Sequence, residues 1–573
     1  MAPRARSRGP LPQAARVAGP PALALAACLA CWAAGWRGTD WAAQIYRSNQ
    51  VATGGLVLWG PGWYGGTFPL SYSLLFPLAG AYLGLWPVAA LSAAGAAFCF
   101  DRLVSKPARL PQPQLSATSR APLPRLRRAA VVVGEPLGSW YFALLTFVPV
   151  AIGQLPTLAG EALALGSVLA LSSQTRRRRA WHAGGLVLGL LAALTTPVAG
   201  SFLAMALVAW GIAEPRRRAL TGAGVLVLAA SAALPLAFES PGWFPFSFAE
   251  AAPVVLIAVL LASPLLEAPG PVRATGALYA LVTVGLWAVR TPMGDNDARL
   301  AAYIGVPLVI CYLPRPLARA GNRLAALVLA AAVTASLAAW DWSPALEAFG
   351  GASDGASSVA SYYVPLAREV ELLSGGRPVK VEVPPLAHHW ESAYLAPQVP
   401  LARGWERQLD IAYAPIFYRP NALRAGTYRQ WLLANGVSYV ALANAPLDYA
   451  AVKEAALLRS GRAEGLVEVW HDKDWELWKV MSSYGLASPP ARVTYLGPDK
   501  VVVRFSQPGE STLKLRWSRY WSLPSSTARQ ACLRQAPGGW TELALRRAGS
   551  LALSVSLVGA DHGICPRLHH RRA

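Results

Sequence analysis

Long apolar runs recur from residue 20 to about residue 340, and they constrain the fold of this chain more than any other feature. A run of about 20 apolar residues is long enough to cross the hydrocarbon core of a bilayer as a helix. Only 14% of the 573 residues are charged, whereas 54% are hydrophobic. The runs and the composition together predict a polytopic α-helical membrane protein and exclude a soluble enzyme.

The positive charge of the chain is distributed in a way that indicates membrane topology. The formal net charge of +22 would suggest nucleic-acid binding in a soluble protein, but the basic residues fall in short clusters between the apolar runs. Such clusters mark cytoplasmic loops by the positive-inside rule. We therefore expect a cytoplasmic basic tail over residues 1–19, about eleven transmembrane helices over 20–341, and no nucleic-acid partner.

The first apolar run has two alternative interpretations. A basic leader before an apolar stretch is also typical of a cleaved signal peptide. Because the leader contains no acidic residues, it is also compatible with a mitochondrial targeting segment. We favour an uncleaved first helix, because cleavage would detach the loop that contains Asp40 from its helix. We expect a multi-pass protein of the cell membrane. Because the number of spans is odd, its N-terminus lies in the cytoplasm and its C-terminal region lies on the extracytoplasmic side.

The character of the chain changes after residue 341. Charges of both signs appear, and alternating segments predict short strands at 379–383, 438–442, 467–470, 475–480, 501–505 and 513–517. An amphipathic helix is expected over 423–435, ending at Gly436. We predict an extracytoplasmic α+β domain over 342–487 and a β-rich, sandwich-like domain over 488–573.

Two of the six cysteines are candidates for a disulfide. Cys532 and Cys565 lie in the terminal domain, which the expected topology places in an oxidising compartment, whereas the other four lie in predicted membrane helices. A thiol inside a membrane helix is most often a small packing residue. Cys532 and Cys565 are therefore the pair most able to bridge.

The first outer loop presents a carboxylate, Asp40, directly after the first helix. A carboxylate at a partly desolvated interface is a candidate general base, although Asp40 is also a good N-cap for the helix that follows it. Trp63 and Tyr64, further along the loop, are candidates for a substrate pocket. Their alternative role is that of an interfacial aromatic belt.

Several other polar residues are candidates for a site. Arg47, Arg290 and Arg299 could hold a phosphate with paired donors, although an arginine near a helix end also snorkels. Glu161 lies within a predicted span, where an ionisable group is costly and is usually paired or functional. Asp295 and Asp297 suggest a divalent cation, against the alternative of a solvated turn; no other cofactor is indicated.

The arrangement of these residues resembles a known family. Asp40 soon after the first helix, the amphipathic segment behind it and the Trp-Tyr-Gly-Gly sequence at 63–66 are similar to the GT-C superfamily of polytopic glycosyltransferases. Three further segments also resemble recurring segments of that superfamily, namely Gly-Gln-Leu-Pro at 153–156, Leu-Thr-Thr-Pro at 194–197 and Gly-Asp-Asn-Asp-Ala-Arg-Leu at 294–300. The closer likeness is to actinobacterial arabinofuranosyl- and mannosyltransferases and to YfhO-like membrane proteins, over residues 20–340.

The resemblance implies a function and roles for the candidate residues. The donor would be a polyprenyl-phosphate-linked sugar, and the acceptor a hydroxyl of an extracytoplasmic glycan, lipid or protein. Asp40 would be the general base of an inverting transfer, the arginines would stabilise the leaving lipid phosphate, and Trp405 and Arg407 would bind the acceptor from an exposed loop. Many relatives carry two neighbouring acids in the first loop, whereas here Asp40 stands alone.

A different class of function is also compatible with the sequence. The protein could be a flippase or transporter of lipid-linked glycans, or a non-catalytic protein of cell-envelope assembly. No ATP-binding loop is present, and no internal repeat of the kind common in transporters is clear. These two absences favour the glycosyltransferase over the transporter. No pattern in the sequence indicates the oligomeric state.

Overall fold

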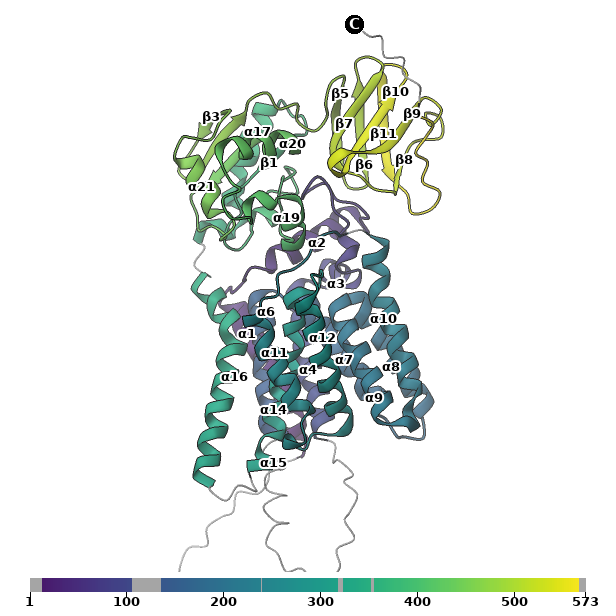
Figure 1. Ribbon diagram of the computed structural model, residues 1–573, viewed down its shortest axis with the longest axis vertical. Coiled ribbons are helices and arrows are strands. Elements are labelled where there is room, and N and C mark those ends of the chain that lie inside the picture. The colour runs from purple at the N-terminus through teal and green to yellow at the C-terminus, as the bar shows by residue number, and fades with distance from the viewer. Residues whose placement is uncertain (1–12, 106–134, 239, 318–322, 352–354, 566–573) are drawn as a thin grey trace, which may run out of the picture. The chain divides into compact units, whose positions relative to one another are not determined.

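The computed structural model describes residues 13–105, 135–238, 240–317, 323–351 and 355–565, and the chain forms two compact units (Figure 1). Unit 1 comprises Met1–Arg37, Leu83–Leu234 and Phe244–Phe349, and unit 2 comprises Gly38–Tyr82, Pro235–Trp243 and Gly350–Ala573. The predicted boundary at 341/342 falls inside a continuous helix, and most of the predicted basic tail lies outside the described residues. The loop after the first helix belongs to unit 2, together with the C-terminal region.

Unit 1 is a bundle of apolar helices. α7 packs against α4 and α8, whereas α12 packs against α9 and α11. Its main helices are α1 (Gln13–Ala33), α4 (Leu85–Val104), α6 (Phe147–Ile152), α7 (Leu155–Leu171), α8 (Arg178–Thr195), α9 (Pro197–Ala213), α10 (Ala219–Ala237), α11 (Phe248–Ala262), α12 (Gly270–Ala288), α14 (Val306–Tyr312), α15 (Pro314–Leu317) and α16 (Arg323–Gly351). α8 ends where Thr196 adopts an extended conformation, and Pro197 then opens α9, since proline fits the first turn of a helix, where its missing N–H would have no intrahelical partner.

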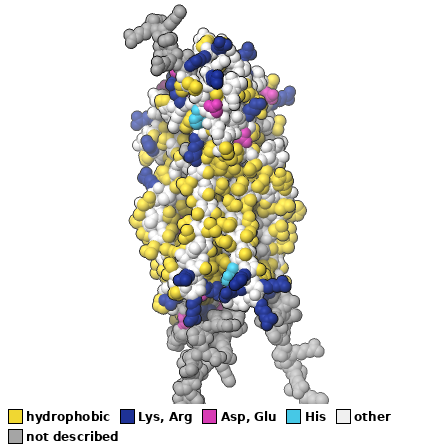
Figure 2. Space-filling view, turned by 90° about the vertical axis from the view of Figure 1, so that its right-hand side faces the viewer, with side chains coloured by type: hydrophobic (Ala, Val, Ile, Leu, Met, Phe, Trp, Pro, Cys, Tyr) yellow, Lys and Arg dark blue, Asp and Glu magenta, His cyan; other side chains and the backbone are white. Residues whose placement is uncertain are grey.

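The surface of unit 1 is that of a membrane protein. Four helical stretches among the described residues are long and apolar enough to cross a membrane: Leu85–Val104, Glu135–Ile152, Ala219–Ala237 and Gly294–Pro316. Four shorter apolar helices accompany them, so the expected number of about eleven spans is not confirmed. Figure 2 shows hydrophobic side chains in a broad band over the helices, with Lys and Arg gathered at one end of them.

The first part of unit 2 is an α+β fold around a four-stranded sheet of order β1-β2-β4-β3. The strands are β1 (Lys380–Glu382), β2 (Val437–Ala443), β3 (Leu466–His471) and β4 (Trp475–Val480), and only the β1–β2 pair is parallel. The helices α17 (Val364–Ser374), α19 (Arg407–Tyr413), α20 (Ala425–Asn435) and α21 (Val452–Arg459) accompany the sheet. The predicted helix is α20, and it ends at Gly436, whose positive φ of 66° suits a glycine.

The second part of unit 2 is a β-sandwich. One sheet has the order β5-β6-β11-β8 and the other β7-β10-β9. The strands are β5 (Ala491–Gly497), β6 (Lys500–Phe505), β7 (Gly509–Arg516), β8 (Trp521–Ser522), β9 (Ala531–Ala536), β10 (Trp540–Leu545) and β11 (Gly549–Val555). Side chains at alternate positions, including Val501, Val503 and Leu513, fill a shared core. The strands predicted from alternation are confirmed in both parts of unit 2.

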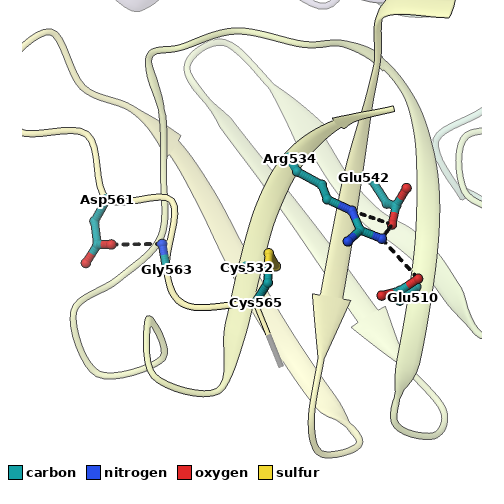
Figure 3. The surroundings of a disulfide bond; sticks show 7 residues. All are labelled: Glu510, Cys532, Arg534, Glu542, Asp561, Gly563 and Cys565. Atoms are coloured by element: carbon teal, nitrogen blue, oxygen red, sulfur yellow. Dashed lines mark hydrogen bonds and ion pairs between the residues drawn. A yellow bond between two sulfur atoms is a disulfide. The ribbon is translucent and has the colours of Figure 1, made fainter. Parts of the chain in front are cut away.

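The two cysteines paired by the sequence argument are joined in the structure. The Cys532–Cys565 disulfide links β9 to the final described residue, with the Cα atoms 4.7 Å apart (Figure 3). Cys28, Cys31 and Cys311 are buried free thiols in unit 1. This distribution agrees with a packing role for the cysteines of the helices.

The segment Leu58–Gly66 connects the separate parts of unit 2. The Asp499 carboxylate accepts hydrogen bonds from the backbone N–H groups of Leu58 and Trp59, and the Trp59 ring lies in the sandwich core. Gly62 O then accepts a bond of 2.8 Å from Leu401 N of the α+β part, and Gly65 O accepts one from Arg516 N of β7. The first loop is thus an integral part of unit 2.

Replacing Asp499 tests how strongly this segment stabilises unit 2. Asp499 has a φ of 55°, so Asp499→Gly preserves the turn but leaves two backbone donors without their acceptor. We expect a loss of about 1–3 kcal/mol, seen as a lower unfolding midpoint by tryptophan fluorescence in detergent. Asn421→Gly, at an exposed residue with φ of 57°, is the control. Equal midpoints for the two variants would contradict the anchoring role.

Candidate functional site

Asp40 occupies the N-cap position of α2 (Trp41–Gly54) in unit 2, but its side chain makes no capping hydrogen bond. The half-buried carboxylate therefore does not cap α2, which was the alternative role expected for Asp40. The carbonyl of the preceding residue, Thr39, accepts a hydrogen bond of 3.1 Å from the indole nitrogen of Trp405. The structure thus brings the predicted base close in space to one of the predicted acceptor-binding residues.

Arg47 is buried, and its charge is balanced within the protein. Its Nη2 lies 2.7 Å from Glu406 Oε1, and its guanidinium stacks 4.1 Å from the centre of the Tyr72 ring. Nη1 is buried without a hydrogen-bond partner among the described residues. Sequence reasoning assigned Arg47 to the donor phosphate, but it could not detect a partner 359 residues away.

Trp63 and Tyr64 are 1% exposed and lie in the core of unit 2. The Trp63 ring stacks on Tyr46 and donates from its indole nitrogen to Ser392 O, and the Tyr64 hydroxyl donates to Glu406 O. Neither ring has an open face. Their geometry is that of packing residues, which differs both from the expected substrate pocket and from an aromatic belt.

The loop of Trp405 and Arg407 is not the exposed loop that we expected. Arg407 forms a bidentate ion pair with Asp448, with contacts of 2.7 and 3.1 Å, and also donates to Tyr418. Arg403, at the start of the same loop, is 2% exposed. Trp405 and Arg407 are both half-buried.

A buried cluster around Arg403 was missed by sequence reasoning. Its guanidinium lies 2.7 Å from Asp410, 3.1 Å from Glu454 and 3.7 Å from Glu382. Three carboxylates thus share one cation, and burial raises the pKa of Glu454 to about 7 and that of Glu382 well above its usual range. The acids come from separate elements, so no local pattern could have predicted the cluster.

His389 lies between two carboxylates, at 3.4 Å from Glu391 and 3.5 Å from Asp448. Burial alone lowers the pKa of His389, but hydrogen bonding and charge attraction from these acids outweigh it and raise the pKa to about 9. Its φ of 54° is unusual for a residue other than glycine. The adjacent histidines at 388 and 389 are therefore not a metal pair, since His389 already has two carboxylate partners.

A mainly apolar cavity of about 380 Å³ lies inside unit 1. Residues of α4, α7, α9 and α12 and the stretch from Arg299 to Tyr312 line it. Its lining on α7 runs from Thr157 to Ser172, at the end of that helix. At a rise of about 1.5 Å per residue, the cavity follows α7 for roughly 22 Å.

Two predicted site residues, Glu161 and Arg299, both line this cavity. Arg299 Nη1 donates to Thr157 Oγ1 over 2.8 Å, and no carboxylate among the described residues forms an ion pair with Arg299. Glu161 lies one helical turn after Thr157 on α7, and its Oε1 is buried without a partner in the described structure. The cavity therefore combines a long apolar wall with a cation and a carboxyl group.

The chain around Arg299 is shaped by an irregular helix. The 3₁₀ turn η4 (Gly294–Asp297) and the short α13 (Ala298–Leu300) precede a π-helical turn, η5 (Ala301–Gly305). π-turns inside helices are frequent at functional sites. Tyr303 of this turn also lines the cavity, and its hydroxyl donates to Gln154 Oε1 at the start of α7.

The other candidates on the same stretch do not line the cavity. Arg290 is exposed. Asp297 is fully buried and accepts from Thr283 over 2.6 Å, whereas Asp295 is half-buried. Within the described residues, no group of three or more His, Cys, Asp or Glu side chains could hold a metal ion. Asp295 and Asp297 are thus the two carboxylates that this stretch offers to a hard cation.

Comparison with known proteins identifies two similar solved structures. No family model matches the chain, and no curated protein matches it. The arabinofuranosyltransferase AftD from mycobacteria has a TM-score of 0.46 and 16% identity, covering 88% of this chain and 41% of that one. A mutant form of AftD has the same TM-score and 13% identity, covering 97% and 61%. The chain thus spans less than two thirds of the length of either, and a likeness this low assigns neither family nor activity.

The ion pairs of His389 predict how stability depends on pH. Its pKa of about 9 in the folded protein exceeds the value of about 6.5 in an unfolded chain. The stabilisation is therefore complete below about pH 6.5 and is lost as pH rises through 9, with an upper limit of about 3 kcal/mol. We expect the unfolding midpoint to fall over this range, and His389→Asn, which tolerates the positive φ, to flatten the dependence.

His471 provides the control for this experiment. It is exposed and lies beside Glu468, so His471→Asn removes a histidine and leaves the buried ion pairs intact. Its pH profile should follow that of the unmodified protein. A His389→Asn profile with the same slope as the unmodified protein would show that His389 does not cause the dependence.

Proposed function

We propose that the protein is a membrane glycosyltransferase that takes a sugar from a polyprenyl-phosphate-linked donor. The acceptor is the hydroxyl of a glycan, lipid or protein on the extracytoplasmic face, with the N-terminus in the cytoplasm. The apolar helices and the motifs that resemble GT-C enzymes support this proposal. The finer assignments follow from the residues of the cavity and of the first loop.

The observation that carries the proposal is the cavity beside Arg299. A polyprenyl phosphate combines a long apolar chain with an anionic head, and the cavity combines an apolar wall with a guanidinium. The charge of Arg299 is available, because its hydrogen-bond partner Thr157 is neutral. Arg47 and Arg315, by contrast, are already paired with Glu406 and Glu135.

The proposed reaction is a single displacement with inversion. Asp40 accepts the proton of the acceptor hydroxyl while the hydroxyl oxygen forms a bond to the anomeric carbon of the donor. The bond between that carbon and the phosphate oxygen breaks, and the lipid phosphate leaves with the electron pair. Arg299 stabilises the negative charge that develops on the phosphate.

One observation favours a second function. A buried carboxyl group without a partner, such as that of Glu161, is also typical of proton-coupled transporters. A flippase that moves a lipid-linked glycan would use the same cavity and would not need Asp40. Donor turnover by the purified protein distinguishes the two functions, because a flippase leaves the sugar–phosphate bond intact.

Replacing Asp40 tests the catalytic step. Asp40→Asn keeps the size of the side chain and removes its basicity, so transfer should fall by about 10²–10⁴-fold. Donor affinity should remain within twofold, since Asp40 does not line the cavity. Transfer of radiolabelled sugar to an acceptor by purified protein measures the first quantity. Asp561→Asn on the exposed sandwich surface is the control, and full activity of Asp40→Asn would sink the assignment.

Replacing Arg299 tests the donor site. Arg299→Gln removes a charge-assisted contact with the phosphate, so the KM for the donor should rise roughly 10–100-fold. Arg299→Lys should recover part of this loss, because it keeps the positive charge. Arg273→Gln changes an exposed arginine on α12 outside the cavity and should leave KM within twofold. An unchanged KM in Arg299→Gln would refute the phosphate role.

A further inference from the structure

Two arginines face each other across neighbouring strands of the sandwich. In the antiparallel pair of β5 and β6, Arg492 stands directly opposite Arg504, and both side chains are exposed. Directly opposed side chains are about 4.5–5.5 Å apart at Cβ, and like charges at that distance destabilise a sheet. The pair therefore carries a cost that a ligand of opposite charge would relieve.

The cost of the arginine pair is not offset within the described structure. Neither Arg492 nor Arg504 forms an ion pair with any described residue. On the other sheet of the sandwich, Arg534 pairs with both Glu542 and Glu510 (Figure 3). Neighbouring acids thus compensate the charge of Arg534, whereas they do not compensate the charges of Arg492 and Arg504.

A hollow of about 700 Å³ lies beside the opposed arginines. The other residues that line it include no acidic side chain: Pro489, Pro490, Ala491, Phe505, Ser506, Ala548 and Gly549. Two more exposed arginines, Arg546 and Arg547, directly precede Ala548 in the chain. The hollow is therefore a cationic environment of a size that suits a small-molecule ligand such as an anionic sugar unit.

An aromatic ring with an open face lies on the same side of the sheet. Tyr495 pairs with Val502, which is two residues from Arg504 on β6 and so shares its face. A Cβ added at Gly497 would lie 2.5 Å from the Tyr495 hydroxyl oxygen and 2.9 Å from its Cζ, so the ring lies flat over that glycine. Tyr495 is 50% exposed. At about 3.3 Å per residue, the ring is roughly 10–15 Å from the arginines.

We propose that this arginine face, formed by Arg492, Arg504 and Tyr495, binds an anionic saccharide chain. A carboxylate or phosphate on one sugar contacts the two guanidinium groups in the hollow, and a sugar ring further along the chain stacks on Tyr495. The spacing requires a chain rather than a single sugar. This binding site goes beyond the proposed function, because it retains a polymer without any transfer of sugar.

Direct binding to the full chain in detergent tests the proposal without a lipid donor. The probes are a uronic-acid hexasaccharide, a phosphate-bearing hexasaccharide, and the carboxyl-reduced, neutral form of the first. We expect at least one anionic probe to bind at least tenfold more tightly than the neutral one, with affinity falling as salt rises. Whichever of the two anionic probes binds more tightly shows whether the site prefers a carboxylate or a phosphate. Equal binding of the neutral probe would overturn the proposal.

Variants separate the arginine face from general surface charge. The double change Arg492→Ser and Arg504→Ser should weaken anionic binding at least tenfold, and Tyr495→Ala should weaken it several-fold. Arg534→Ser also removes a positive charge from the sandwich surface and should leave binding within twofold. All four residues are exposed, and an unfolding midpoint that does not fall below that of the unmodified protein verifies the fold. Unimpaired binding by the double variant would contradict the site.

A nucleic acid also combines anions with rings that stack, so a hexathymidylate probe completes the set. Tighter binding of this probe than of both anionic saccharides would overturn the saccharide assignment. Because no donor is present, a negative result leaves the transferase proposal untouched. Loss of transfer in Asp40→Asn, equally, has no bearing on saccharide binding by the sandwich.

Discussion

The structure of unit 2 depends on the interaction between Asp499 and the backbone of the first loop. Two N–H groups from residues 58 and 59 bond to one carboxylate more than 400 positions later in the chain. The same segment contacts the α+β part through Gly62 and the sandwich through Gly65. A loop that follows the first apolar helix is thereby built into the C-terminal region, which holds Asp40 close in space to Trp405.

The arginines of this protein differ in whether a neighbouring acid balances their charge. Arg47 and Arg403 are buried, Arg407 is half-buried, and all three are paired with acids, so removing one partner would leave an uncompensated charge. Arg299 has only a neutral partner within the described residues, in a cavity that is otherwise mostly apolar. Arg492 on the sandwich surface has no ion-pair partner among the residues described. The latter two positions are where an anionic ligand gains most.

The sequence was most informative where local patterns decide the structure. Apolar runs predicted the helical unit, alternation predicted the strands, and Gly436 predicted the end of α20. Long-range partners had no local signature, so the burial of Trp63 and Tyr64 and the ion pair of Arg47 were not foreseen. Glu161 and Arg299 were chosen from local signals, namely their positions on predicted helices and the cost of a charge inside a membrane. Both residues line the same cavity. The predicted count of about eleven spans is not confirmed, because several apolar helices are short or irregular.

In the proposed donor complex, the cavity of unit 1 binds the lipid-linked donor with its phosphate at Arg299. The most direct measurement is an experimental structure of the full chain with a bound polyprenyl phosphate. We expect phosphate density within hydrogen-bond distance of the Arg299 guanidinium, and chain density along α7 beside Glu161 and Ala164. A lipid phosphate bound at another position, with the cavity of unit 1 empty, would contradict it.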